Sequence, residues 1–155
     1  MPSKFSSTCS ILLSVTSIVW GGNWAHWRGP AGNGSSPDAK PPIEWSETKN
    51  VKWKVPVPGR GSGSPVIWEN KVFVVSAVAA KGGRGFDGER LSKLAFKLFC
   101  FDRETGKILW QKTTITATPH QGTHSTNGFA SASPCTNGKH VYAHFGSRGL
   151  YCYTC

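Results

Sequence analysis

Two stretches of the chain repeat the same order of turns and strands, and this repeat constrains the fold more than any other feature. The segment "GSGSPVIWENKVFVVS" (61–76) matches "ASASPCTNGKHVYAHF" (130–145) at a spacing of 69 residues. The next segment also recurs, since "LFCFD" (98–102) matches "LYCYT" (150–154) at a spacing of 52 residues. A chain with such internal repeats folds as stacked copies of one small unit.

The difference between the two spacings predicts an insertion in the first copy. About 17 additional residues separate its second and third strands, and the segment 79–95 is rich in Gly and charged residues, as surface loops are. We therefore expect a first unit at 61–114 that carries this insertion. The second unit, at 130–155, is expected to be truncated.

The residue types within each unit are those of short antiparallel strands. Asn70 in "ENK" and Asn137-Gly138 in "TNGK" occupy places where a tight hairpin turn favours a positive φ. The composition agrees, because 18 Gly, 10 Pro and 7 Trp accompany only 17% charged residues. The predicted class is all-β, with four-stranded antiparallel units in the form of β-propeller blades, of which about two are present.

One turn in the first unit, "DRETGK", has residues suited to a sharp reversal. Asp102 can accept hydrogen bonds from the following backbone N–H groups, and Gly106 can adopt the left-handed conformation. Trp110 then supplies a large apolar side chain that a neighbouring unit can bury. Trp53 in "VKWKVPV" matches Trp110 at a spacing of 57 residues, which indicates a strand of the same kind before the first unit.

This stretch resembles the tryptophan-docking motif of PQQ-like (quinoprotein-type) β-propeller repeats, A-x-D-x-x-T-G-x-x-x-W. Asp102, Thr105, Gly106 and Trp110 fall on the pattern, and Cys100 stands where the family usually has Ala. The resemblance implies that the Trp packs between adjacent blades, so these five residues are expected to be structural.

Other phrases of the chain resemble exported bacterial members of that family, the branch related to the barrel-assembly lipoprotein propeller of the outer membrane. These phrases are "WRGPAGNG" (27–34), "VKWKVPVPGRGSGSP" (51–65) and "ASASPCTNGKHVYAHFGSRGLYCY" (130–153).

The N-terminal residues are expected to direct export. The run Cys9–Trp20 is apolar and has the length of a signal-peptide core, and Lys4 is the only charge before Gly22. We predict a signal peptide at 1–21, with an uncleaved anchor as the alternative, and no transmembrane segment after cleavage. The protein would then be periplasmic or secreted, with an N-terminal extension at 22–50 and a partial propeller at 51–155.

The resemblance implies a binding or scaffolding platform without catalysis. Quinoprotein dehydrogenases use a stacked PQQ cofactor, a calcium ion and a catalytic Asp, and residues 22–155 contain no identifiable version of this set. We therefore expect no catalytic residue and no cofactor in this part of the protein, and a protein or small-ligand partner on the propeller face. The alternative is the N-terminal part of a PQQ-dependent dehydrogenase whose catalytic residues lie downstream.

The loop 118–134 contains the candidate polar site. His120 and His124 are four residues apart, a spacing that can chelate a metal, yet no Asp or Glu follows Glu104 in the sequence. Histidines hydrogen-bonded within a loop are the favoured interpretation, and no metal is expected. The loop lengthens the connection between Trp110 and Pro134 to about twice that between Trp53 and Pro65, and it is therefore a reasonable ligand or partner site.

Three further features receive structural interpretations. The net charge of +10 comes from scattered Lys and Arg residues, which favours solvated surfaces over nucleic-acid binding. Cys152 and Cys155 would point to opposite faces of a strand, which argues against a zinc or redox site. The segment 58–65, "PGRGSGSP", lacks the ending of a phosphate-binding loop and more simply allows close packing of small residues.

Overall fold

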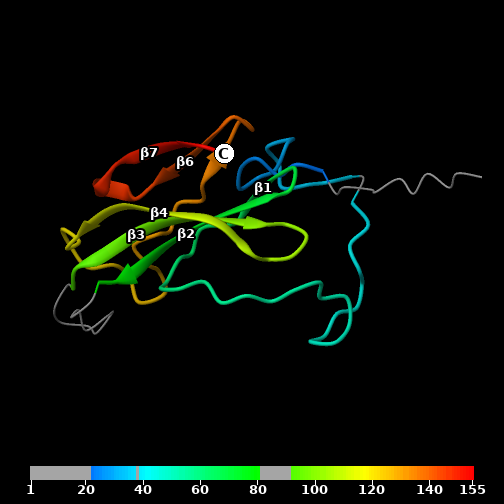
Figure 1. Cartoon of the computed structure of the whole chain (residues 1–155), viewed down its shortest axis with the longest axis horizontal. Helices are drawn as coiled ribbons and strands as arrows, with labels where there is room; N and C mark the ends of the chain where they lie inside the picture. The colour runs from blue at the N-terminus through cyan, green and yellow to red at the C-terminus, as the bar shows by residue number, and fades with distance from the viewer. Residues whose placement is uncertain (1–21, 38, 81–91) are drawn as a thin grey trace, which may run out of the picture.

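The strands of the protein form two antiparallel sheets (Figure 1). The computed structural model describes residues 22–37, 39–80 and 92–155, so the predicted signal peptide at 1–21 lies outside the described residues. The predicted all-β class with antiparallel sheets is confirmed: the described part of the chain has one short 3-10 helix, η1 (Gly146–Arg148), and no α-helix. None of its segments forms a helix long and apolar enough to span a membrane.

The first sheet has four strands in sequence order. They are β1 (Val66–Trp68), β2 (Lys71–Ala79), β3 (Leu94–Asp102) and β4 (Ile108–Ala117). Strands β2 and β3 extend into both ends of the predicted insertion at 79–95, because the apolar alternation continues through Leu94 and Phe96, which are buried. Most of that insertion (81–91) lies outside the described residues.

The second sheet has three strands, again in sequence order. They are β5 (Cys135–Thr136), β6 (His140–His144) and β7 (Leu150–Thr154). The register pairs Val141 with Tyr153 and Tyr142 with Cys152. Because side chains alternate between the two faces of a strand, these two pairs lie on opposite faces of the sheet.

The main core lies between the two sheets. The first sheet contributes Phe73, Val75, Phe96, Leu98 and Cys100, and the second contributes Val141, Ala143, Tyr151 and Tyr153. The ring of Phe96 meets that of Phe145 edge-on, with 5.3 Å between their centroids, a favoured arrangement of aromatic pairs. The burial of this apolar surface on both sides is the main force that holds the sheets together.

The two sheets stack head to tail: the face of the first sheet that meets the second is not equivalent, by the sequence repeat, to the face of the second sheet that meets the first. Phe73 of β2 faces the second sheet, but its repeat counterpart Tyr142 lies on the opposite face of β6 from the core residue Val141. The cysteines follow the same rule, since Cys100 is completely buried and its counterpart Cys152 is exposed. The first sheet therefore contacts the second sheet with one face, and the equivalent face of the second sheet points away from this contact.

An extended segment, 51–57, covers part of the other face of the first sheet. Val55 packs there against a small cluster that contains Val72, Phe99 and Phe101. Figure 1 shows the chain approaching the sheet in cyan and green before it enters β1. Among the described residues, the first sheet thus has packing partners on both faces, whereas the second has them on one.

The segments next to the first strand of each sheet tie the two sheets together. Trp24 forms an antiparallel bridge with Ile67 of β1, and the carbonyl of Ala25 accepts a hydrogen bond from the N–H of Thr136 in β5. The glycine-rich segment 58–65 runs between the end of β2 and the loop 128–133. A Cβ atom on Gly61 would collide with the carbonyl oxygen of Val75, so this part of the chain serves close backbone packing.

Candidate functional site

The turn Asp102–Lys107 is closed by one carboxylate. Oδ1 of Asp102 accepts hydrogen bonds from both the N–H and the Oγ1 of Thr105, each at 2.7 Å, and its Oδ2 accepts one from Nδ2 of Asn70 at 2.6 Å. The hydrogen bonds from Thr105, followed by those from Asn70 and the backbone of Glu104, hold the pKa of Asp102 below its ordinary value. This side chain therefore fixes the turn in its ionised form.

The tryptophan that lies on this turn is Trp53. Its Nε1 donates a hydrogen bond to the carbonyl of Arg103 at 2.8 Å. Its ring covers Gly106, whose φ is 71°, and a Cβ atom on that glycine would lie 2.7 Å from the indole. Only glycine fits both the left-handed backbone and the close approach of the ring.

Trp110 lies elsewhere, on the face of the first sheet that meets the second sheet. It is opposite Cys100 in the register and packs beside Phe73, with 5.9 Å between the ring centroids. The five residues of the predicted docking motif thus divide into two places, with Asp102, Thr105 and Gly106 in the turn and the other two in the core. The spacing of 57 residues marked Trp53 as the repeat counterpart of Trp110. It was the sequence feature that pointed to Trp53, the tryptophan that lies on the turn Asp102–Lys107.

Cys100 has no reactive thiol in the folded protein. Burial between the sheets is the largest influence and raises its pKa to about 12, although the charge of Lys71 acts in the opposite direction. A thiol with this pKa stays protonated near neutral pH and is a poor nucleophile and metal ligand. The residue that replaces the usual Ala of the motif therefore acts as a small apolar side chain.

The two candidate metal ligands are not brought together with further donors. Nδ1 of His120 is hydrogen-bonded to Oγ of Ser147 at 2.9 Å, and Nδ1 of His124 is hydrogen-bonded to Oγ1 of Thr126 at 2.8 Å. Within the described ranges, no three His, Cys, Asp or Glu side chains are arranged to hold a metal ion. Each histidine uses one ring nitrogen in a local hydrogen bond.

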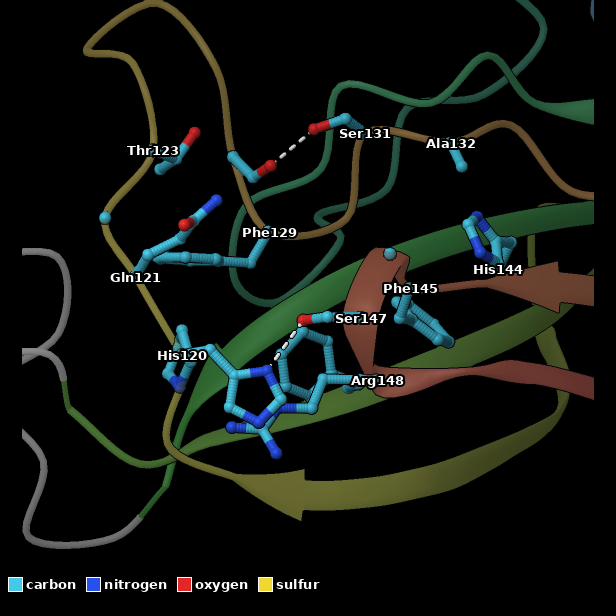
Figure 2. Close-up of a pocket in the computed structure, with 15 residues that line it drawn as sticks. His120, Gln121, Thr123, Phe129, Ser131, Ala132, His144, Phe145, Ser147 and Arg148 are labelled. Atoms are coloured by element: carbon cyan, nitrogen blue, oxygen red, sulfur yellow. Dashed lines mark hydrogen bonds between the residues drawn. The ribbon is translucent and has the colours of Figure 1, made fainter.

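A cavity of about 340 Å³ opens where the loop 118–132 passes the end of the second sheet (Figure 2). Its apolar wall is formed by Phe96, Phe129 and Phe145, of which the first and last belong to the core between the sheets. The cavity is therefore a partly open continuation of that core. Its volume lies in the range of small-ligand sites.

Polar side chains gather on one side of the cavity. Figure 2 shows His120, Ser147 and Arg148 close together there, with His144 at the other side. Nη2 of Arg148 donates to the carbonyl of Thr118, whereas its Nε is buried and has no hydrogen-bond partner. An apolar wall beside a few convergent polar groups is the usual composition of a binding site for a small molecule.

Sequence reasoning identified one half of this cavity. The enlarged loop with His120 was expected to bind a ligand or partner, but Ser147 and Arg148 in the turn between β6 and β7 were not singled out. The sequence signal that could have identified them is the phrase "FGSRGL", whose two glycines indicate a tight turn. In the structure Gly146 and Gly149 have φ values of 57° and 104°, and the turn directs these side chains toward the loop.

No family model matches the chain, and no match is found among curated proteins or solved structures. The architecture and the cavity are therefore the grounds for any functional assignment.

Proposed function

We propose that the protein is an exported PQQ-like β-propeller repeat protein that acts as a non-catalytic binding or scaffolding platform. The observation that carries the proposal is the head-to-tail stacking of two sheets that share one sequence repeat. Heterologous contacts of this kind generate rings or open arrays, because every unit presents a face complementary to the next one. A ring of such antiparallel sheets is a propeller.

Contacts between repeat counterparts near the start of each sheet support this proposal. The backbone N–H of Ser64 donates to Oγ of Ser133 at 2.8 Å, and these residues are 69 positions apart. The first strands, β1 and β5, lie against each other. In a propeller the first strand of each blade lies nearest the axis, so equivalent positions of adjacent blades converge there.

The contact of Trp53 with the turn Asp102–Lys107 gives independent support. Trp53 is the repeat counterpart of Trp110 and lies on the turn of the first sheet, and Val55 in the same segment packs on the face turned away from the second sheet. The segment 51–57 thus occupies the place of the last strand of a preceding unit. Such a unit would place its tryptophan on the turn of the first sheet.

The platform would use the cavity beside the loop 118–132 as its ligand site. This loop is the connection between two repeat units, and such connections can vary without loss of the stacked sheets. We assign no catalytic residue and no cofactor to it. Its imidazole, hydroxyl and guanidinium groups lie beside aromatic rings and can serve recognition.

A ligand screen with a blocked cavity tests this assignment. Ligand-observed NMR on the full chain with a mixture of small acids, amides and amines should identify binders. The variant Ser147→Trp should abolish binding, because an indole at this exposed position would fill the cavity. The control Thr116→Trp, on exposed β4, should bind as the wild type does; equal binding by both variants would refute the cavity as the site.

Export is tested separately. Mass spectrometry of the protein recovered from the exterior of the producing cell should find an N-terminus near Gly22, as the apolar run before it predicts. Recovery of the chain with Met1 intact would contradict cleavage.

A further inference from the structure

The side chains that line the cavity beside Arg148 favour a ligand of negative charge. None of its lining residues is acidic, and no Asp or Glu occurs anywhere after Glu104. The lining includes one permanent cation, Arg148, and two histidines. The lining residues therefore bring positive charge and no negative charge to the cavity.

Arg148 lacks an anionic partner in the described part of the chain. The ion pairs found there are Lys49–Glu44, Lys52–Glu104 and Lys54–Glu47, and none of them involves a residue of the cavity. The guanidinium of Arg148 is half-buried, and it donates only to the carbonyl of Thr118. A partly desolvated cation with unused donors gains from a carboxylate, which can accept two parallel hydrogen bonds from a guanidinium.

The neighbouring groups restrict the ligand further. The Oγ of Ser147 is hydrogen-bonded to Nδ1 of His120 at 2.9 Å, so a hydroxyl and an imidazole lie beside the cation. If the Ser147 hydroxyl donates to Nδ1, the imidazole keeps its Nε2–H for an anion; if Nδ1–H donates to Oγ, the hydroxyl keeps its own proton for the anion. The rings of Phe96 and Phe145 form an apolar surface next to them. An anion without an apolar part would leave this surface exposed to water.

We propose that this cavity binds a small organic monocarboxylate with an aromatic or branched apolar body. The carboxylate lies at Arg148, with one further donor from the hydrogen-bonded pair of Ser147 and His120, and the body lies against Phe96 and Phe145. This inference rests on the proposed function, because it names the chemical class that the binding platform would take in its cavity.

Three probes separate the contributions of charge and apolar body. Calorimetric titration of the full chain, at constant ionic strength, uses phenylacetate, its neutral counterpart phenylacetamide, and acetate. Phenylacetate should bind at least tenfold more tightly than either of the others, because the amide lacks the charge and acetate lacks the ring.

Variants of the cation test the position of the carboxylate. Arg148→Gln should weaken phenylacetate binding at least tenfold and leave the affinity for phenylacetamide within twofold of the wild type. Lys139→Gln removes one exposed positive charge outside the cavity and should change the phenylacetate affinity less than twofold. If Arg148→Gln fails to fold by circular dichroism, Arg148→Lys decides, since it keeps the charge and loses the planar fork; it should weaken binding at least threefold.

Each outcome bears on one of the two proposals. Equal affinity for phenylacetate and phenylacetamide, or unchanged phenylacetate binding by the Arg148 variant that folds, overturns the carboxylate inference and leaves the platform standing. Failure of all the acids, amides and amines of the wider screen overturns both.

Discussion

Cys100 and Cys152 occupy equivalent positions of the repeat and have opposite surroundings. Cys100 is completely buried between the sheets, whereas Cys152 is exposed on the outer face of the second sheet. The same contrast holds around them: Phe73 is buried, and its counterpart Tyr142 lies on the outer face, where Leu150 is 66% exposed. Position within a repeat therefore does not set burial.

Burial is set by whether a neighbouring layer is present. The first sheet has the second sheet on one face and the segment 51–57 on the other, and it supplies most of the buried aromatic side chains. In the described part of the chain the second sheet packs against a neighbour on one face, and its other face carries His, Cys and Tyr. We therefore expect stability to reside mainly in the first sheet.

The largest expected effect follows from removal of a side chain that both sheets share. Phe96→Ala should lower the free energy of unfolding by about 3–5 kcal/mol, because it leaves a cavity at the contact with Phe145. Chemical denaturation monitored by tryptophan fluorescence would measure it. The exposed Ile108→Ala should change stability by about 0.5 kcal/mol or less; equal effects would show that the sheets do not share a core.

The covered outer face of the first sheet is tested by Trp53. Trp53→Ala should lower the free energy of unfolding by about 2 kcal/mol, since the ring is half-buried and its N–H bond to Arg103 is lost. Trp53→Phe keeps a ring and should cost about 1 kcal/mol. A variant Trp53→Ala as stable as the wild type would mean that segment 51–57 contributes nothing to this face.

A pH series tests the turn beneath Trp53. The lowered pKa of Asp102 means that its carboxylate stabilises the fold above the ordinary Asp pKa of about 4. That stabilisation is lost as the pH falls through the lowered pKa of the folded state. Asp102→Asn should therefore melt below the wild type at pH 7, and the gap should close toward pH 2. The control Glu69→Gln removes an exposed carboxylate next to Asn70 that belongs to none of the ion pairs of the described residues, and it should follow the wild type. A gap for Asp102→Asn that stays constant with pH would contradict this role.

The last prediction concerns the reactivity of the cysteines and requires no change in stability. At pH 8, iodoacetamide should modify Cys152 and Cys135 rapidly and Cys100 only after unfolding, because burial raises the pKa of Cys100 to about 12. Peptide mass spectrometry at timed intervals distinguishes the sites. Rapid modification of Cys100 in the folded protein would show that the two sheets separate in solution.

Much of the local structure could be predicted from the sequence. The repeat spacings, the alternation of apolar residues and the turn at Asp102–Lys107 predicted the strands of both sheets. These features depend on neighbours along the chain, whose conformations are limited by sterics and by local hydrogen bonds. The loop with His120 was also singled out as a candidate site, because the connection from Trp110 to Pro134 is longer than its counterpart; its role in binding stays a prediction.

The tertiary structure decided which repeat positions are buried and which residues meet. Sequence alone could not tell that Trp53 and not Trp110 lies on Gly106, since both tryptophans satisfy the same pattern. It also could not bring Ser147 to His120, because their hydrogen bond depends on how the second sheet stacks on the first. Local pattern fixes the strand and its alternation, but the choice of face belongs to the packed layers, where burial of apolar surface outweighs the small preferences of single residues.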